Sequence, residues 1–196
     1  MSIAAMNPFM GELIQTSSPG VTCSWCQIAQ YELLPVAISN TAILVSTTLT
    51  AQVQTITTGI TNPDVVRNVV AKGAIATSTG NVVITGTDYA GTSISETIVL
   101  SGTTVVAGLK AFATVTQIAL PVTSGAGDGV SVGVGSKLGL PYTLTKNTVR
   151  VAYNNNVLET TAPIVATDPV NLCNNTVTLA STLAGNVIDI LLLIPG

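Results

Sequence analysis

Apolar and polar residues alternate with a period of two along much of the chain, which is the pattern of half-buried β-strands. Clear examples are residues 52–56 and 148–153, where Arg150 falls on the polar side. Shorter apolar runs at residues 42–45 and 187–195 predict strands that are buried on both faces. No long segment has the amphipathic period of a helix, so the pattern predicts an all-β protein.

The middle of the chain has the most regular alternation of strands and turns. Asp88-Tyr89-Ala90-Gly91 separates two alternating runs, which predicts a hairpin. Gly108 interrupts a later run, and the segment 65–71 suits either a strand or a short helix. Regular spacing with glycine-rich turns is typical of an antiparallel β-sandwich or a jelly-roll-like barrel. The strands predicted here are residues 81–87, 92–100, 104–107 and 110–120.

Residues 125–135 are rich in glycine and invite comparison with phosphate-binding loops. A P-loop requires Gly-Lys-Ser/Thr at the start of a helix, whereas here Lys137 follows Ser136 and then Leu138-Gly139. A dinucleotide fingerprint requires a third glycine and a helix, which this segment lacks. Valine alternating with glycine or serine predicts a bulged or closely packed strand instead.

Residues 1–30 differ from the rest of the chain. They hold all three methionines and the single tryptophan, and proline and glycine interrupt them. Two interpretations stay open: an extended N-terminal arm that docks on a partner, or a segment that folds back on its own domain. Residues 31–196 form the β domain, with a subdivision near residue 141 left open. The candidate interface residues of the arm are Phe9, Met10, Leu13, Ile14 and Trp25.

The composition changes the expected surface. Hydrophobic residues make up 47% of the chain and charged residues only 8%, against about 25% charged in an ordinary soluble domain. The surface is therefore built from threonine, serine and asparagine, as in a neutral secreted domain, or other subunits cover it. A net charge of −3 with scattered cations argues against nucleic-acid binding. We see neither a secretion signal nor an apolar stretch long enough to span a membrane.

The chain offers few groups for catalysis. It has no histidine, so Ser-His-Asp and Cys-His arrangements are excluded. Of the carboxylates, Asp88, Glu96 and Asp128 are the nearest to a pair, but they fall at turns or on an alternating strand, where solvation explains them. Calcium loops need several acidic or amide residues at alternate positions, which neither turn has. We predict no enzyme, no cofactor and no metal.

The three cysteines do not form a disulfide framework, because their number is odd. Cys23 and Cys26 have the CxxC spacing of half a zinc site or of a redox pair. Zinc needs two further ligands, and only Cys173 remains in a chain without histidine. The redox interpretation lacks the thioredoxin-like context, so we expect reduced cysteines in an extended arm.

The order of motifs over residues 65–141 resembles a module of small virion structural proteins of tailed bacteriophages. That resemblance implies a decoration or cement protein on the capsid surface of the virion, rich in β-structure and oligomeric. Its implied partners are the major capsid protein and copies of itself, and no catalytic residues carry over. Alternatives are a tail-tube, head-completion or fibre component, or a cell-surface adhesin or carbohydrate-binding module. The motifs are Asn81–Asp88, Glu96–Thr103, Lys110–Phe112, Val115–Ile118, Gly127–Gly133 and Lys137–Pro141.

Overall fold

The computed structural model describes residues 26–195 of the chain. Within that range the only helix is a single 3₁₀ turn, η1 (Leu172–Asn174), and every strand pair is antiparallel. The predicted all-β class is therefore confirmed. The strands are β1 (Cys26–Leu33), β2 (Ser39–Thr48), β3 (Gln54–Ile56), β4 (Arg67–Gly73), β5 (Asn81–Thr87), β6 (Ser93–Val99), β7 (Val106–Phe112), β8 (Thr114–Leu120), β9 (Gly129–Gly139), β10 (Val149–Asn154), β11 (Val157–Leu158), β12 (Ile164–Ala166), β13 (Thr176–Thr178) and β14 (Ile188–Pro195).

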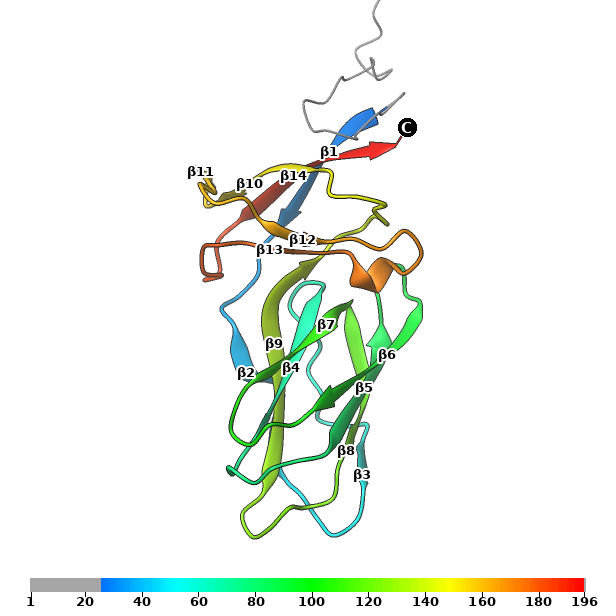
Figure 1. Cartoon of the computed structure of the whole chain (residues 1–196), viewed down its shortest axis with the longest axis vertical. Helices are drawn as coiled ribbons and strands as arrows, with labels where there is room; N and C mark the ends of the chain where they lie inside the picture. Colours follow the sequence, from blue (N-terminus) through cyan, green and yellow to red (C-terminus); the bar gives the residue numbers. More distant parts are fainter. Residues whose placement is uncertain (1–25, 196) are drawn as a thin grey trace, which may run out of the picture.

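Strands β2 to β9 form a two-sheet sandwich that occupies the lower part of Figure 1. One layer has the order β2-β9-β4-β7 and the other β3-β8-β5-β6. Apart from the β5–β6 hairpin, consecutive strands fall in different sheets, which is the strand order of a jelly roll. The predicted antiparallel sandwich is thus present in its jelly-roll form. We refer to β2–β9 as the jelly roll.

The core of the jelly roll follows from the alternation of its strands. In β5, Val82 and Ile84 are fully buried while Val83 and Thr85 point the other way and stay half-exposed. Val130, Val132 and Val134 of β9 face them from the second sheet. Burying such side chains contributes about 1.5–3 kcal/mol each before the cost of chain ordering is counted. The hydrophobic effect therefore holds the two sheets together.

Glycines in β9 allow close packing rather than ligand binding. A Cβ on Gly133 would overlap the backbone carbonyl oxygen of Ser39 in β2, and one on Gly135 would overlap the side chain of Asn68 in β4. Both glycines are needed because their neighbours lie where a side chain would begin. The predicted closely packed strand at residues 125–135 is confirmed for its strand portion.

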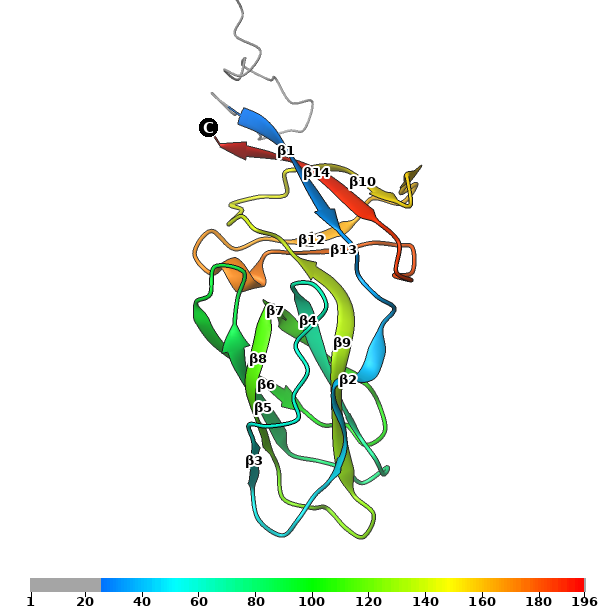
Figure 2. The ribbon, with the colours of Figure 1, turned by 180° about the vertical axis from the view of Figure 1, so that it is seen from behind.

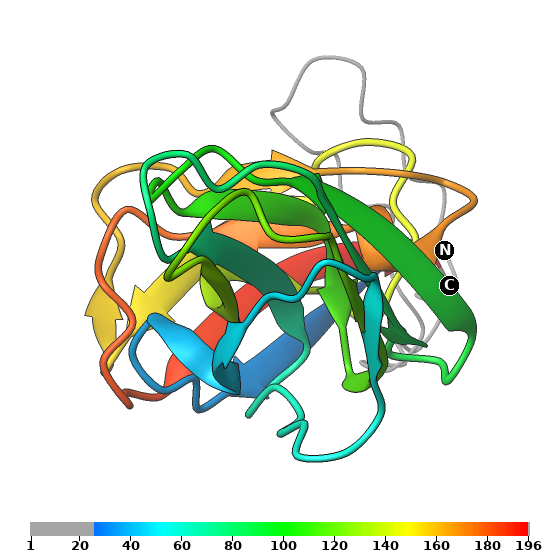
Figure 3. The ribbon, with the colours of Figure 1, turned by 90° about the horizontal axis from the view of Figure 1, so that it is seen from below.

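The remaining strands form a second unit, which we call the distal module: β1 together with β10–β14. Its main sheet has the order β1-β14-β10-β11, while β12 and β13 extend the jelly-roll sheet beside the end of β9. Figures 1 and 2 show the main distal sheet running obliquely to β9 at one pole of the molecule. In the view along the long axis, β1 and β14 lie side by side behind the jelly roll (Figure 3). Its core is centred on Leu138, Leu140, Ile188, Ile190 and Leu192.

The N-terminal boundary differs from the expected one. Residues 26–30 are not part of an arm, because all of β1 pairs with β14 from Cys26 opposite Pro195 to Leu33 opposite Ile188. β9 ends at Gly139, close to the possible subdivision near residue 141. The second unit, however, also takes β1 from the other end of the sequence.

Two local predictions need correction, and one alternative left open from the sequence is settled. The break placed at Gly108 lies instead at Ala113, between β7 and β8, where the Ala113 N–H bonds to the Thr87 carbonyl. The ambiguous segment 65–71 is a strand, β4. Strand β14 is fully buried on one face, at Ile190 for example, but Asp189 on the other face is only half-buried.

Candidate interaction surfaces

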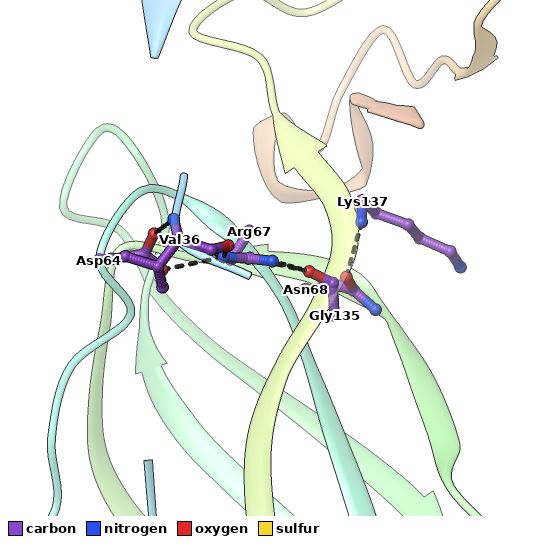
Figure 4. A network of polar contacts seen from close by, with 6 residues as sticks. All are labelled: Val36, Asp64, Arg67, Asn68, Gly135 and Lys137. Atoms are coloured by element: carbon purple, nitrogen blue, oxygen red, sulfur yellow. Dashed lines mark hydrogen bonds and ion pairs between the residues drawn. The ribbon is translucent and has the colours of Figure 1, made fainter. Parts of the chain in front are cut away.

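A buried arginine ties the connection from β1 to the jelly roll (Figure 4). Arg67, at the start of β4, has no exposed surface. Its guanidinium donates to the carbonyl of Gly135 in β9, to the carbonyl of Val36 at 3.0 Å, and to the carboxylate of Asp64 at 3.1 Å. Because Val36 lies in the β1–β2 connection and Gly135 on β9, the arginine holds together segments that lead into both units.

The surrounding polar groups complete this junction. Asn68 donates its amide to the Gly108 carbonyl and accepts the Lys137 N–H at 2.9 Å. Burial lowers the pKa of Arg67, and the charge and hydrogen bonds of Asp64 partly offset that effect. A guanidinium remains charged under all ordinary conditions, so the ion pair joins a buried cation to a partly exposed carboxylate.

An aromatic contact adds to the junction from the other side. The ring of Tyr31 in β1 meets the ring of Tyr89, in the β5–β6 turn, edge to face with centroids 6.1 Å apart. Burial, and then the proximity of Tyr89, raise the pKa of Tyr31. Edge-to-face pairs of this kind contribute about 0.5–1.5 kcal/mol beyond area burial.

Each of the three carboxylates singled out from the sequence accepts hydrogen bonds from groups that lie near it in the fold. Asp88 accepts the N–H groups of Ala90 and Thr92, both at 2.9 Å, and closes the β5–β6 turn. Glu96 points inward at the sheet edge and accepts the Leu109 N–H of β7 at 2.6 Å.

Asp128 is held more tightly than the other two. It accepts the Ser78 hydroxyl, the Ser124 N–H and the Gly129 N–H. Burial raises its pKa, but these hydrogen bonds outweigh burial and lower the pKa overall. The expectation that solvation explains these carboxylates is wrong for Asp88 and Asp128, because only 5% and 2% of their surfaces are exposed.

A cleft of about 340 Å³ lies where the β5–β6 hairpin, β7 and η1 meet. The Lys110 ammonium on its wall donates to the Ser95 carbonyl at 2.8 Å. Cys173 on the opposite wall is a free, buried thiol whose pKa is raised, mainly by burial. The polar groups that line the cleft come from Asp88, Thr92, Ser93, Ser95, Lys110 and Asn171.

The outer face of the β3-β8-β5-β6 sheet carries no ionisable side chain. Its central row crosses all four strands in the order Thr55, Ala119, Val83 and Thr97. Neighbouring rows are equally neutral, with Thr87 and Thr114 hydrogen-bonded through their hydroxyls at 2.7 Å. We call this surface the neutral face. Its outward residues are Thr55, Asn81, Val83, Thr85, Thr87, Ser93, Ser95, Thr97, Val99, Thr114, Gln117 and Ala119.

The interface residues predicted from the sequence, Phe9, Met10, Leu13, Ile14 and Trp25, lie outside the described residues, as does Cys23. Sequence reasoning missed the junction at Arg67, which it counted among scattered cations. A signal was present, because Arg67 and Asn68 interrupt a run from Val65 to Ala71 that is otherwise apolar and suited to burial.

Comparison with known proteins gives no relative: no family model, no curated protein and no solved structure matches the chain. Across residues 26–195, the acidic and cysteine side chains form no cluster of three or more that could hold a metal ion. The same range contains no helix with the length and apolar character needed to cross a bilayer.

Proposed function

We propose that this protein is a non-enzymatic structural component of a tailed-phage virion, a cement or decoration protein that binds and stabilises the major capsid shell. The observation that carries the proposal is the neutral face. Four strands present a row of threonine, valine and alanine side chains with no charge among them. A free monomer ordinarily keeps its surface soluble with mixed charges.

Covering the neutral face has a low electrostatic cost. Burying an ionised side chain without a partner costs several kcal/mol, whereas hydroxyls need only find hydrogen-bond partners. Thr55, Thr97 and their neighbours can both donate and accept such bonds. A stable interface takes roughly 800 Å² from each partner, which a four-stranded face is of the right order to supply.

The architecture supports the proposal as an analogy only. Jelly rolls are found in viral capsid proteins, but also in lectins and cupins, so the fold alone does not decide function. The arm is the second proposed contact. Because residues 26–30 belong to β1, the arm is residues 1–25, with Phe9, Met10, Leu13, Ile14 and Trp25 as its docking side chains.

The first test is location. Purified virions of the source phage, analysed by mass spectrometry and labelled in electron micrographs, should contain the protein in many copies on the outside of the head. Its absence from the particles would overturn the proposal. Labelling at the tail would favour the tail-tube, head-completion or fibre alternatives instead.

The second test addresses the neutral face. Particles stripped of the protein are incubated with the purified full-length chain, and bound protein is measured. A double variant with Thr55→Lys and Thr97→Lys should bind at least about tenfold more weakly, because two cations must be desolvated. The control, Thr143→Lys, changes an exposed loop residue away from the face and should bind normally. Equal binding by all three proteins would remove the neutral face from the proposal.

The third test addresses the arm. Deletion of residues 1–25 leaves every pair of β1 with β14 in place, whereas deletion to residue 30 would remove five of them, Cys26 to Gln30. The shorter deletion should keep the thermal transition of the full chain and lose particle binding. Undiminished binding would show that the arm is not a contact.

Glycan binding is a second candidate function, and the cleft favours it. Hydroxyl and amide groups of Ser93, Ser95 and Asn171 line it beside the apolar side chain of Leu172. Small sites of this mixed kind suit neutral polar ligands. A glycan array probed with the purified protein and with a Ser93→Phe variant, which fills the cleft, tests it. Binding that Ser93→Phe abolishes would support this function.

A further inference from the structure

Among the sheet edges of residues 26–195, that of β1 lacks the features that prevent edge pairing. Natural edges are kept short, bulged, charged or covered. Here β3, β11 and β12 have only two or three residues. The edge of β7 is covered by Glu96, and the Ser95 carbonyl of β6 is occupied by Lys110. The pairing of β2 with β9 is irregular at two places.

β1 is long and regular, and its one charged side chain is Glu32. It is an eight-residue strand without proline, glycine, lysine or arginine, and its pairing with β14 shows no register shift. Its side chains alternate cleanly over most of its length. Ala29, Tyr31 and Leu33 pack on the distal core, while Ile28 is 63% exposed. A strand added beside β1 would therefore find both a regular backbone and a continued apolar layer.

The register identifies the backbone groups that face outward. The Leu193 N–H donates to Thr148, and the Val187 carbonyl accepts from Asn155, so odd-numbered residues of β14 bond toward β10. Antiparallel pairs alternate between bonded and non-bonded. Ile28, opposite Leu193, is thus a non-bonded pair, and its N–H and C=O point away from β14. The same holds for Cys26, Gln30 and Glu32.

We propose that β1 pairs with β1 of a second copy of this chain, antiparallel about a two-fold axis at Ala29. Ile28 then lies opposite Gln30 of the second copy, and Cys26 opposite Glu32 of the second copy. Each pair exchanges the outward-facing backbone bonds just identified. The two distal sheets, each of four strands, become one continuous sheet.

Three features favour this register over its neighbours. It overlaps the whole of residues 26–32 with itself. It places the small side chain of Ala29 at the axis, in a non-bonded pair where antiparallel strands approach most closely, at about 4.5 Å between Cα atoms. It also keeps the two Glu32 carboxylates at opposite ends of the pairing, whereas a shift that set them face to face would be repulsive.

This inference depends only on the β1 edge and not on particle binding. The full-length protein should sediment as a dimer at micromolar concentration. Ile28→Lys, which places a charge on the edge, and Gln30→Pro, which removes an outward-facing N–H, should each weaken dimerisation at least about a hundredfold. Val157→Lys, an exposed position on the opposite edge strand β11, is the matched control and should remain dimeric. Circular dichroism confirms that each variant is folded.

The register has its own test. In a C23S/C26S background, Ala29→Cys should form an intermolecular disulfide with oxidised glutathione, while Glu32→Cys should not. A dimer that survives Ile28→Lys and Gln30→Pro, or a full-length protein that is monomeric throughout, would overturn the inference. So would a monomer that dimerises only after residues 1–25 are removed, because the chain would then cover its own edge. A monomer that still binds particles contradicts this inference alone, and a dimer absent from particles contradicts the proposed function alone.

Discussion

The jelly roll and the distal module are built from the chain in opposite ways. The jelly roll uses one continuous stretch, from Ser39 in β2 to Gly139 in β9, and closes its own core. The distal module takes β1 from one end of the described chain and β10–β14 from the other, and it shares Leu138 at the end of β9 with the jelly-roll sheet. Both cores consist of buried side chains, but only the core of the jelly roll comes from one continuous stretch of the sequence. We infer that the jelly roll can fold by itself and that the folding of the distal module depends on the jelly roll.

The hydrogen bonds of Arg67 provide a physical link for that dependence. Arg67 belongs to the jelly roll, yet it bonds to Val36 in the connection that leads from β1. Removing the arginine takes this donor from the carbonyls of Gly135 and Val36, whereas Asp64 is partly exposed and keeps the Val36 N–H. The consequences of such a loss should differ between the two units, and the following variants test that difference.

The largest effect is expected for Arg67→Ala. The variant loses a fully buried side chain and its hydrogen bonds to two carbonyls, and a hydrogen bond to a charged group contributes about 1.5–3 kcal/mol. If the junction couples the units, calorimetry should show one thermal transition in the wild type and two in the variant, the first belonging to the distal module. Thr143→Ala, at an exposed loop position, should stay within about 0.5 kcal/mol of the wild type. A single transition in both proteins would contradict the proposed coupling.

An intermediate effect is expected for Asp128→Asn in the jelly roll, at about 1–3 kcal/mol, because the amide cannot satisfy all three donors. The pKa of Asp128 is lowered in the folded state, so its contribution is present above the unfolded pKa of about 3.9 and is lost as the pH falls through the folded pKa. Urea denaturation between pH 7 and pH 2 should therefore show a smaller decrease in the free energy of unfolding for the variant than for the wild type.

Asp168 offers the corresponding measurement in the distal module. Its pKa is also lowered, first by the backbone hydrogen bond from Asn171 and then by the side-chain bonds from Asn171 and Asn174. Asp168→Asn should likewise reduce the decrease in the free energy of unfolding at acid pH. If the units are coupled through Arg67, both carboxylates should act on the same transition. Separate acid transitions for the two variants would show that the units unfold independently.

The smallest effect is expected for a matched pair of core substitutions. Ile84 in the jelly roll and Ile190 in the distal module are both fully buried. Ile→Val removes one methylene and typically costs about 0.5–1.5 kcal/mol. In the coupled wild-type background, both variants should lower one common transition. In the Arg67→Ala background, Ile190→Val should lower only the first transition, and a shift of both transitions would argue against the division drawn here.

The fold was readable from the sequence where its signals are local. The hairpin over β5 and β6 follows from strict alternation and the Asp88–Gly91 turn, so both strands fall within two residues of their expected ends. β1 was not predicted because its partner, β14, lies at the other end of the chain. The break between β7 and β8 was misplaced because Gly108 lies within β7 and makes room for the Glu96 carboxylate. That carboxylate occupies the place where a Cβ on residue 108 would be.

The interaction surfaces were less predictable. Low charge indicated a covered surface, but not that the outward positions of four strands would align into one neutral face, since that depends on register. Asp88 and Asp128 look like ordinary turn carboxylates in the sequence, and only the converging N–H groups show why they are buried. The arm residues from Phe9 to Trp25 remain a prediction, since they lie outside the described residues.

The pairing of β1 with β14 has a consequence for how the protein is made. Gln30 bonds to Asp189, which follows 159 residues later. During translation, β1 leaves the ribosome long before β14 exists, so both of its edges stay unsatisfied while the jelly roll is already able to fold. The nascent chain is then most prone to wrong association, and a chaperone that holds an extended segment would have its natural target at the β1 segment.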